Sequence, residues 1–200
     1  MKTLTKTLFA TVLAVVLLAS SSVKALAVNT IQLAVPATGF NKIWVSGNVK
    51  VFLTQSDKEG VFVEEDFNPA FTSVMGKGNT LYINSTEIGC VVIRVSVKDL
   101  QRIEAAGNAQ VVTSNKFDVK CLQVILSQSA SAKVNAIAGS LYTNVREDAR
   151  LKMSGVTDQH TAVATNAKNV QLDGLLSLST KRPQADMELG LVAAQLTAIK

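Results

Sequence analysis

The most restrictive feature of this sequence is an internal repeat. The frame I-x-x-x-G-N-[VA]-x-V occurs at residues 43–51 and again at residues 103–111, so the two copies start 60 residues apart. Further along, short units place an alanine before an aliphatic segment, and these alanines are separated by 21, 19 and 18 residues (Ala109, Ala130, Ala149 and Ala167). Sixty residues is close to three such intervals. The spacing predicts a chain that coils in turns of 18–21 residues, each stacked on the one before.

Apolar and polar residues alternate with a period of two through most of the chain. The alternation is clear at residues 43–53, 61–63, 81–83, 91–97 and 149–153. A period of two is typical of a strand with one buried face, and no segment after Ala27 has the apolar spacing, cap and stop of an amphipathic helix. We therefore predict an all-β fold in which residues 28–200 form a single β-solenoid domain.

A parallel β-helix, or β-solenoid, also explains the composition, which is 48% hydrophobic but only 5% aromatic. Turns stacked about 4.8 Å apart place equivalent inward positions in register, so that small aliphatic side chains form columns in a narrow interior. Gly47 and Gly107 are expected to supply positive φ angles at corners, with Asn48 and Asn108 directly after them. An antiparallel β-sandwich, with a turn about every 8 to 12 residues, is the alternative.

The N-terminus has the pattern of a signal peptide. Lys2 and Lys6 precede an apolar run at residues 8–19, and the small-x-small triplet Ala25-Leu26-Ala27 predicts cleavage after Ala27. A dozen apolar residues are too few to cross a hydrocarbon layer, which needs about 20. We expect an exported protein, in the periplasm or at the cell surface, without a transmembrane segment in its mature chain.

The net charge is a weaker clue than its value suggests. The chain carries +5, but three of its 20 basic residues and none of its 15 acidic residues lie within residues 1–27. The mature chain is therefore close to neutral, at +2. Nucleic acid binding requires clustered cations that release counterions, so we do not expect a nucleic acid partner.

Several motifs together carry a family resemblance. They are F-x-x-I-x-V-x-G-x-V-x-V at residues 40–51, Thr54-Gln55, L-Y-I at residues 81–83, and V-x-V-x-x-L-x-x-I-x-x-x-G at residues 95–107. In this order they resemble the auto-transporter adhesin head domain family, also called the GIN domain or DUF2807, over about residues 40–180. The resemblance implies an exported bacterial protein, common in the Bacteroidetes, with a right-handed parallel β-helix and no catalytic residues. The chain departs from the family at Ser56-Asp57, where glycine is commoner.

Candidate catalytic residues are few. His160 is the only histidine, and Ser154 and Asp158 lie close to it in one polar stretch. A triad requires convergence from different elements, so we interpret this stretch as a connecting loop. A lone histidine and two separate cysteines do not make a zinc site. We predict no enzyme, no metal and no cofactor.

The densest carboxylate groups are Glu64-Glu65-Asp66 and Glu147-Asp148. Calcium needs six to eight oxygen ligands, and glycoside hydrolysis needs two opposed carboxylates. Neighbouring residues on a strand point to opposite faces, so these carboxylates are better interpreted as solvated turns.

Outward basic residues are the main candidates for a ligand surface. They could form a strip along one side of the solenoid that binds an acidic polysaccharide or a lipopolysaccharide phosphate. Interleaved acidic residues leave open an ordinary mixed-charge surface that resists edge pairing. The basic candidates are Arg94, Lys98, Arg102, Arg146, Arg150 and Lys152.

Two aromatic residues complete the candidate ligand surface. Trp44 and Phe52 lie in the phase opposite to Ile43 and Val51, where an exposed ring could stack on a sugar or anchor a protein partner. Alternatively, residues 31–35 cover these rings as an N-terminal cap, while residues 189–196 close the other end.

The two cysteines, Cys90 and Cys121, are 31 residues apart, about one and a half turns. They should therefore lie on different sides of the coil, farther apart than the roughly 5.5 Å that a disulfide requires between Cα atoms. We expect two unpaired, partly buried thiols.

Two function classes remain. The first is a non-catalytic envelope or cell-surface module that binds a glycan, a protein partner or copies of itself. The second is a polysaccharide lyase or hydrolase on a β-helix scaffold, a fold that supports both binding and cleavage. A lyase would need a cleft where Asp, Lys and Arg converge, whereas a binding module would not.

Overall fold

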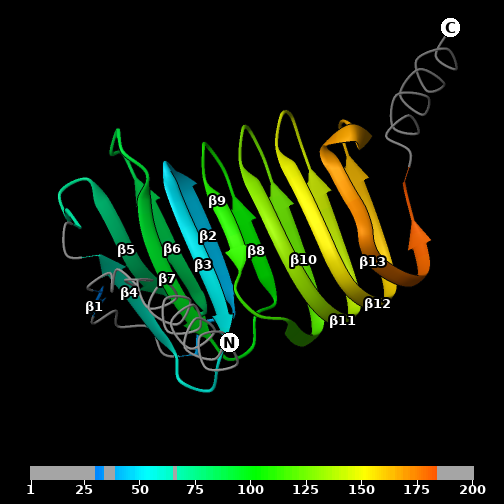
Figure 1. Cartoon of the computed structure of the whole chain (residues 1–200), viewed down its shortest axis with the longest axis horizontal. Coiled ribbons are helices and arrows are strands. Elements are labelled where there is room, and N and C mark those ends of the chain that lie inside the picture. The colour runs from blue at the N-terminus through cyan, green and yellow to red at the C-terminus, as the bar shows by residue number, and fades with distance from the viewer. Residues whose placement is uncertain (1–29, 34–38, 65–66, 184–200) are drawn as a thin grey trace, which may run out of the picture.

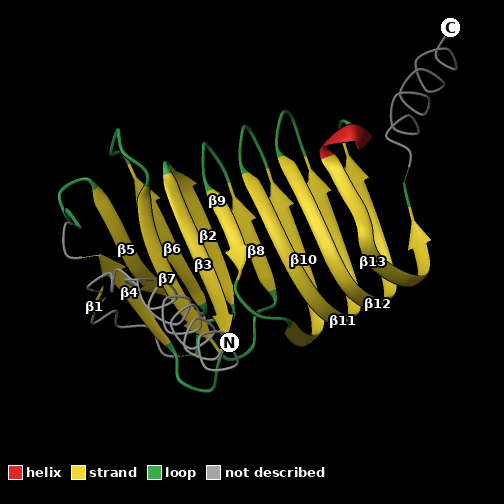
Figure 2. Cartoon of the chain, in the orientation of Figure 1, coloured by secondary structure: helices red, strands yellow, loops and turns green. Residues whose placement is uncertain are grey.

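A computed structural model describes residues 30–33, 39–64 and 67–183 of the chain. The expected signal peptide, Glu65, Asp66 and the predicted C-terminal cap at residues 189–196 lie outside these residues. Within the described part there are thirteen strands and one short 3-10 turn, η1 (Ala167–Asn169). Figure 2 shows strands in yellow over most of this part and η1 in red. The all-β class predicted from the alternation is therefore confirmed.

All of the described strands belong to one sheet (Figure 1). Its order is β1-β4-β7-β3-β9-β11-β10-β8-β2-β6-β5, and β12 and β13 follow beyond β11. The strands are β1 (Thr30–Leu33), β2 (Lys42–Gly47), β3 (Val49–Gln55), β4 (Gly60–Glu64), β5 (Thr72–Lys77), β6 (Thr80–Ser85), β7 (Val91–Val97), β8 (Arg102–Ala105), β9 (Gln110–Thr113), β10 (Phe117–Leu126), β11 (Ser131–Val145), β12 (Arg150–Ala164) and β13 (Val170–Lys181).

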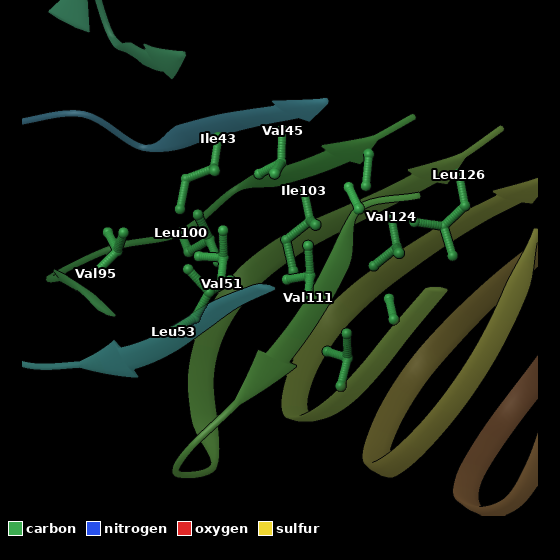
Figure 3. Close-up of a cluster of buried hydrophobic side chains, with 14 of the residues drawn as sticks. Ile43, Val45, Val51, Leu53, Val95, Leu100, Ile103, Val111, Val124 and Leu126 are labelled. Carbon is green, nitrogen blue, oxygen red and sulfur yellow. The ribbon is translucent and has the colours of Figure 1, made fainter. Parts of the chain in front are cut away.

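The sheet curls so that two of its sides face each other across a shared core. Strands β2 and β3 meet at a corner formed by Gly47 and Asn48, and β2 pairs with β8 while β3 pairs with β9. Figure 3 shows the side chains of Ile43 and Val45 from β2 directed toward those of Val51 and Leu53 from β3. All are buried in one hydrophobic cluster.

The longer strands each contribute to both sides of the curl. The first residues of β11 pair with β9, whereas its second half pairs with β10, whose end in turn pairs with β8. Nine of the twelve strand pairings are parallel. The three antiparallel pairings involve β1, β4 and β5 near the N-terminal end of the sheet.

The register of the parallel pairs among β8 to β12 has the spacing that the alanines predict. Arg102 pairs with Gln123 and Gln110 with Ser131, which are offsets of 21 residues, while β11 and β12 are offset by 19 (Ser131 with Arg150). The corner alanines are stacked, since the backbone N–H of Ser131 donates to the carbonyl of Ala109. The described strands form an open, curled and mainly parallel sheet. This is not the arrangement of an antiparallel sandwich.

The interpretation of the 60-residue repeat as three turns is wrong. Ile43 pairs directly with Ile103, and Val51 pairs directly with Val111, so the two copies of the frame lie on adjacent strands. The chain between them folds back through β4 and the β5–β6 hairpin, and places β6 and β7 on the outer side of β2 and β3. In Figure 1 the blue and cyan pair β2 and β3 lies between β6/β7 and β8/β9.

Inward side chains stack in columns through this register. One column runs Leu81, Ile43, Ile103 and Val124, and all four side chains are buried. Full burial of an aliphatic side chain stabilises a fold by about 1.5–3 kcal/mol. Because parallel pairing places like positions on top of one another, the repeat in sequence becomes a continuous core.

The N-terminal and cysteine predictions need correction. Residues 31–33 form part of β1, which extends the sheet at the edge of β4 and leaves β2 and β3 uncovered by it, while residues 34–35 lie outside the described part. The edge of β4 offers unpaired backbone groups, and β1 satisfies them. Cys90 and Cys121 are free thiols but are exposed, not partly buried, because neither is directed into the core.

The loop predicted around His160 is also wrong. Ser154, Asp158 and His160 all lie in β12, which continues around a bend where Gly155 has a φ of 116°. His160 is 1% exposed and stacks on Leu141. Its Nε2 lies 3.0 Å from the hydroxyl of Thr143, and its Nδ1 has no partner. Polar residues facing outward at a bend in a continuous strand resemble a loop in sequence.

We expect Gly47→Ala to lower the free energy of unfolding by more than about 2 kcal/mol. The φ of Gly47 is 82°, and an added Cβ would overlap the backbone carbonyl of Ser85 on the adjacent strand. Gly78→Ala is the control, because Gly78 has a φ of 56° but open space around it, so only the φ penalty should appear. Urea unfolding of both variants measures the difference. An equal loss of unfolding free energy in the two variants would contradict the expected overlap between the added Cβ at position 47 and the Ser85 carbonyl.

We expect the stability of the native chain to fall as the pH drops below about 6.5. Burial, and to a lesser extent the Arg182 guanidinium, lower the pKa of His160 from its usual 6.5. The unfolded chain therefore takes up a proton first, and each unit by which the pKa is lowered corresponds to about 1.4 kcal/mol. The stability that this histidine contributes is present above pH 6.5 and is lost as the pH falls toward the folded pKa.

The control is the double variant Thr143→Val/His160→Leu, which replaces both hydrogen-bonding partners by apolar groups. His160 is the only histidine, so this variant should lose the pH dependence between neutral pH and the range where carboxylates titrate. Urea unfolding over a pH series measures it. The same pH slope in both proteins would show that His160 is not responsible.

Candidate functional site

A hollow lined by cations lies on the outer face of the sheet, over β9, β11, β12 and the start of β13. It has a volume of about 500 Å³. We call it the basic groove and define it by its four cationic side chains, Lys133, Arg150, Lys152 and Lys168. Gln110 and Ser131 lie among them.

The strand register brings these side chains together. Lys133 pairs with Lys152 on the neighbouring strand, so their Cα atoms are separated by about one strand spacing of 4.8 Å. Arg150 precedes Lys152 by two residues and shares its face, because Leu151 between them is directed into the core. Lys168 comes from η1, in the connection between β12 and β13. Three successive segments therefore supply the four charges.

None of the cations of the basic groove forms an ion pair with a carboxylate of the described residues. No Asp or Glu lines the groove. Across residues 30–33, 39–64 and 67–183 the one ion pair within 4.0 Å is Lys98 with Asp57, at 3.3 Å and on an exposed surface. Four like charges in a hollow produce a positive potential, and guanidinium and ammonium groups form charge-assisted hydrogen bonds with carboxylate, sulfate or phosphate oxygens. The groove is suited to bind an anion.

A second, smaller group of cations lies on the same face. Lys50 of β3 and Arg94 of β7 each lie 5.2 Å from the centre of the Phe52 ring. We call these three side chains the Phe52 cluster. Phe52 is half-buried, and both cations lie next to its ring. The ring therefore positions Lys50 and Arg94 through cation–π contacts.

The site residues predicted from the sequence lie on different parts of the curled sheet. Arg150 and Lys152 belong to the basic groove, and Phe52 and Arg94 belong to the Phe52 cluster on the same face. Trp44 lies on the other side of the curl, in β2, with its ring centre 6.0 Å from that of Tyr82. The sheet thus brings four of the eight predicted residues to one face.

The remaining three predicted cations are engaged elsewhere. Arg102 of β8 donates from Nε to the side-chain oxygen of Gln123 at 2.8 Å. Arg146 lies at a corner and donates to Asn144 at 3.3 Å, and Lys98 is paired with Asp57. Arg102 lies on β8, Arg146 lies at a corner and Lys98 directly follows β7, so none of the three lines the basic groove.

Sequence reasoning missed Lys50, Lys133 and Lys168. A signal for Lys133 was present, because Lys133 and Lys152 are separated by 19 residues, which is the offset of β11 and β12. Lys50 lies in the outward phase of its segment. Lys168 follows Ala167 as Arg150 follows Ala149, so the spacing of the alanines held a signal for it as well, although η1 lies outside the strand register.

Within the described residues, the candidate catalytic side chains considered from the sequence do not converge on one site. The described residues contain no group of three His, Cys, Asp or Glu side chains able to hold a metal ion. His160 is buried whereas Asp158 is exposed, and Glu147 and Asp148 lie in an exposed turn, as expected from the sequence. The basic groove itself is lined by no histidine, cysteine or carboxylate. The described helical content, a single 3-10 turn, includes nothing that could cross a membrane.

Two crystal structures from Parabacteroides distasonis are similar to this chain. One is described as a putative adhesin, with 17% identity and a TM-score of 0.56, and the match covers 77% of this chain and 76% of that chain. The other is described as a putative lipid binding protein, with 13% identity and a TM-score of 0.54, covering 77% of both chains. Identities this low show a shared fold. No curated protein matches the chain.

The family comparison covers nearly all of the described sheet. The model of the family described as "putative auto-transporter adhesin, head GIN domain", DUF2807, matches residues 39–181, from just before β2 to the end of β13. The resemblance noted in the motifs at residues 40–51 and 95–107 is thereby confirmed, and the chain belongs to the DUF2807 family of auto-transporter adhesin head domains.

Proposed function

We propose that this protein is an exported, non-catalytic binding module of the cell envelope or cell surface that holds a glycan or a protein partner. The basic groove carries the proposal, because four cations gather in one hollow that no carboxylate lines and in which none of them forms an ion pair. The adhesin description of the family and of one similar structure supports a binding role.

The proposal also includes the fold of the domain and the export of the protein. Parallel offsets of 19–21 residues support a right-handed parallel β-helix for the single domain at residues 28–200. The charged N-terminus, the apolar run and the triplet ending at Ala27 support export with cleavage after residue 27. A rigid stack of turns suits a surface module, since it presents side chains at fixed spacing.

The alternative is a polysaccharide lyase or hydrolase. Lys and Arg in the basic groove could neutralise an acidic sugar, which is one part of lyase chemistry. Cleavage also needs a group placed to move a proton, and hydrolysis canonically needs two carboxylates. The lining of the groove offers no carboxylate, histidine or tyrosine, so its lysines are the remaining groups able to transfer a proton and hydrolysis lacks both of its carboxylates. Binding without cleavage therefore fits the site better.

The test uses the chain from Val28 onward on a glycan array and in a pull-down from envelope extracts. We expect retention of a glycan or an envelope protein that weakens as the salt concentration rises, since exposed charges are screened over about 8 Å at physiological ionic strength. The heat-unfolded chain is the control. Binding to neither material would contradict the proposal, and shortening of a bound polysaccharide during incubation would favour the enzyme instead.

A further inference from the structure

The geometry of the outer face points to a more specific ligand, and we propose that it is a linear anionic glycan lying across the strands. Its chain would run from the Phe52 cluster to the basic groove. This inference rests on the proposed binding function and adds the class and the orientation of the ligand.

Both groups of cations lie on one row of paired residues. The row runs Arg94, Phe52, Val112, Lys133 and Lys152, and each member is the register partner of the next. Adjacent strands are about 4.8 Å apart, so three steps separate Arg94 from Lys133 by about 14 Å along the direction across the strands. The two groups of cations are therefore in line, and β9 is the one strand between β3, which carries Lys50, and β11, which carries Lys133.

The surface that leads from the Phe52 cluster into the basic groove is neutral. Gln110 and Ser131, which line the near side of the groove, lie beside the row, on the parallel row that joins Lys50 to Arg150. They offer an amide and a hydroxyl, while Val112 offers an apolar contact. Sugar rings present hydroxyl groups and C–H faces, and both find partners on such a surface. A polymer with acidic groups separated by neutral ring atoms matches this order of side chains.

An extended acidic peptide fits this face less well. Peptides that bind to sheets commonly add a strand at an open edge. Strands β3, β9, β11 and β12 are each hydrogen-bonded to a neighbour on both sides, so this face has no open edge. Recognition here must come from side chains alone. A compact anion, such as a single phosphate, would occupy the basic groove and leave Lys50 and Arg94 unused.

The experiment measures the binding of polygalacturonate oligomers of increasing length by calorimetry, using the chain from Val28 onward. We expect the affinity to rise from the disaccharide to the octasaccharide, as the oligomer becomes long enough to reach both groups of cations. Lys133→Glu/Lys152→Glu and Lys50→Glu/Arg94→Glu should each weaken octasaccharide binding by roughly tenfold or more.

The matched control is Lys77→Glu/Lys120→Glu, which reverses the same number of charges on exposed residues outside the row. It should change the affinity much less than either test pair. Because Lys50 and Arg94 pack on Phe52, thermal unfolding must show that each variant remains folded, and Lys50→Gln/Arg94→Gln provides a milder second variant for that cluster.

Three results would overturn the inference. Inorganic phosphate or the disaccharide binding as tightly as the octasaccharide would indicate a compact anion site. Equal losses in the control pair and the test pairs would indicate non-specific attraction. If the array or the pull-down finds a ligand but polygalacturonate does not bind, the proposed binding function stands and the anionic glycan is excluded.

Discussion

Parallel strand register is the constraint on which the rest of this structure depends. An offset of 60 residues places Ile43 on Ile103 and one of 19 residues places Ser131 on Arg150, so that inward positions form columns and outward positions form rows. The same pairing that buries the aliphatic core therefore also aligns the charges outside. A change of register by one residue would exchange the two sets of side chains, with loss of both core and site.

The corners show how closely the strands must pack. Gly47 has a positive φ and leaves no room for a Cβ beside Ser85, and Gly155 is in the same situation beside Ala136. These glycines let neighbouring turns approach at the spacing that the backbone hydrogen bonds require. Near the C-terminal end of the core, Thr143 and His160 replace aliphatic members of the columns, and a hydrogen bond between them offsets part of the cost of their burial.

Much of the candidate site was readable from the sequence, residue by residue. The alternation in residues 149–153 identified Arg150 and Lys152 as outward, and the 19-residue interval relates Lys133 to Lys152. Alternation alone could not separate Arg94 from Arg102, because it gives the face of each strand and not its side of the curl. Arg102 therefore lies away from the groove although it has the same phase and charge.

The sequence by itself determined the strand character, the inward aliphatic residues, the register offset of the later parallel strands and the corner glycines. These follow from local periodicity and from the conformations that single residues allow. The tertiary structure alone decided that β2 and β3 lie between β6/β7 and β8/β9, and that His160 is buried in a continuous strand. It also decided that Lys168 joins the basic groove. Such pairings depend on which strand edges meet in three dimensions. The order of residues within one strand does not specify which other strand lies next to it.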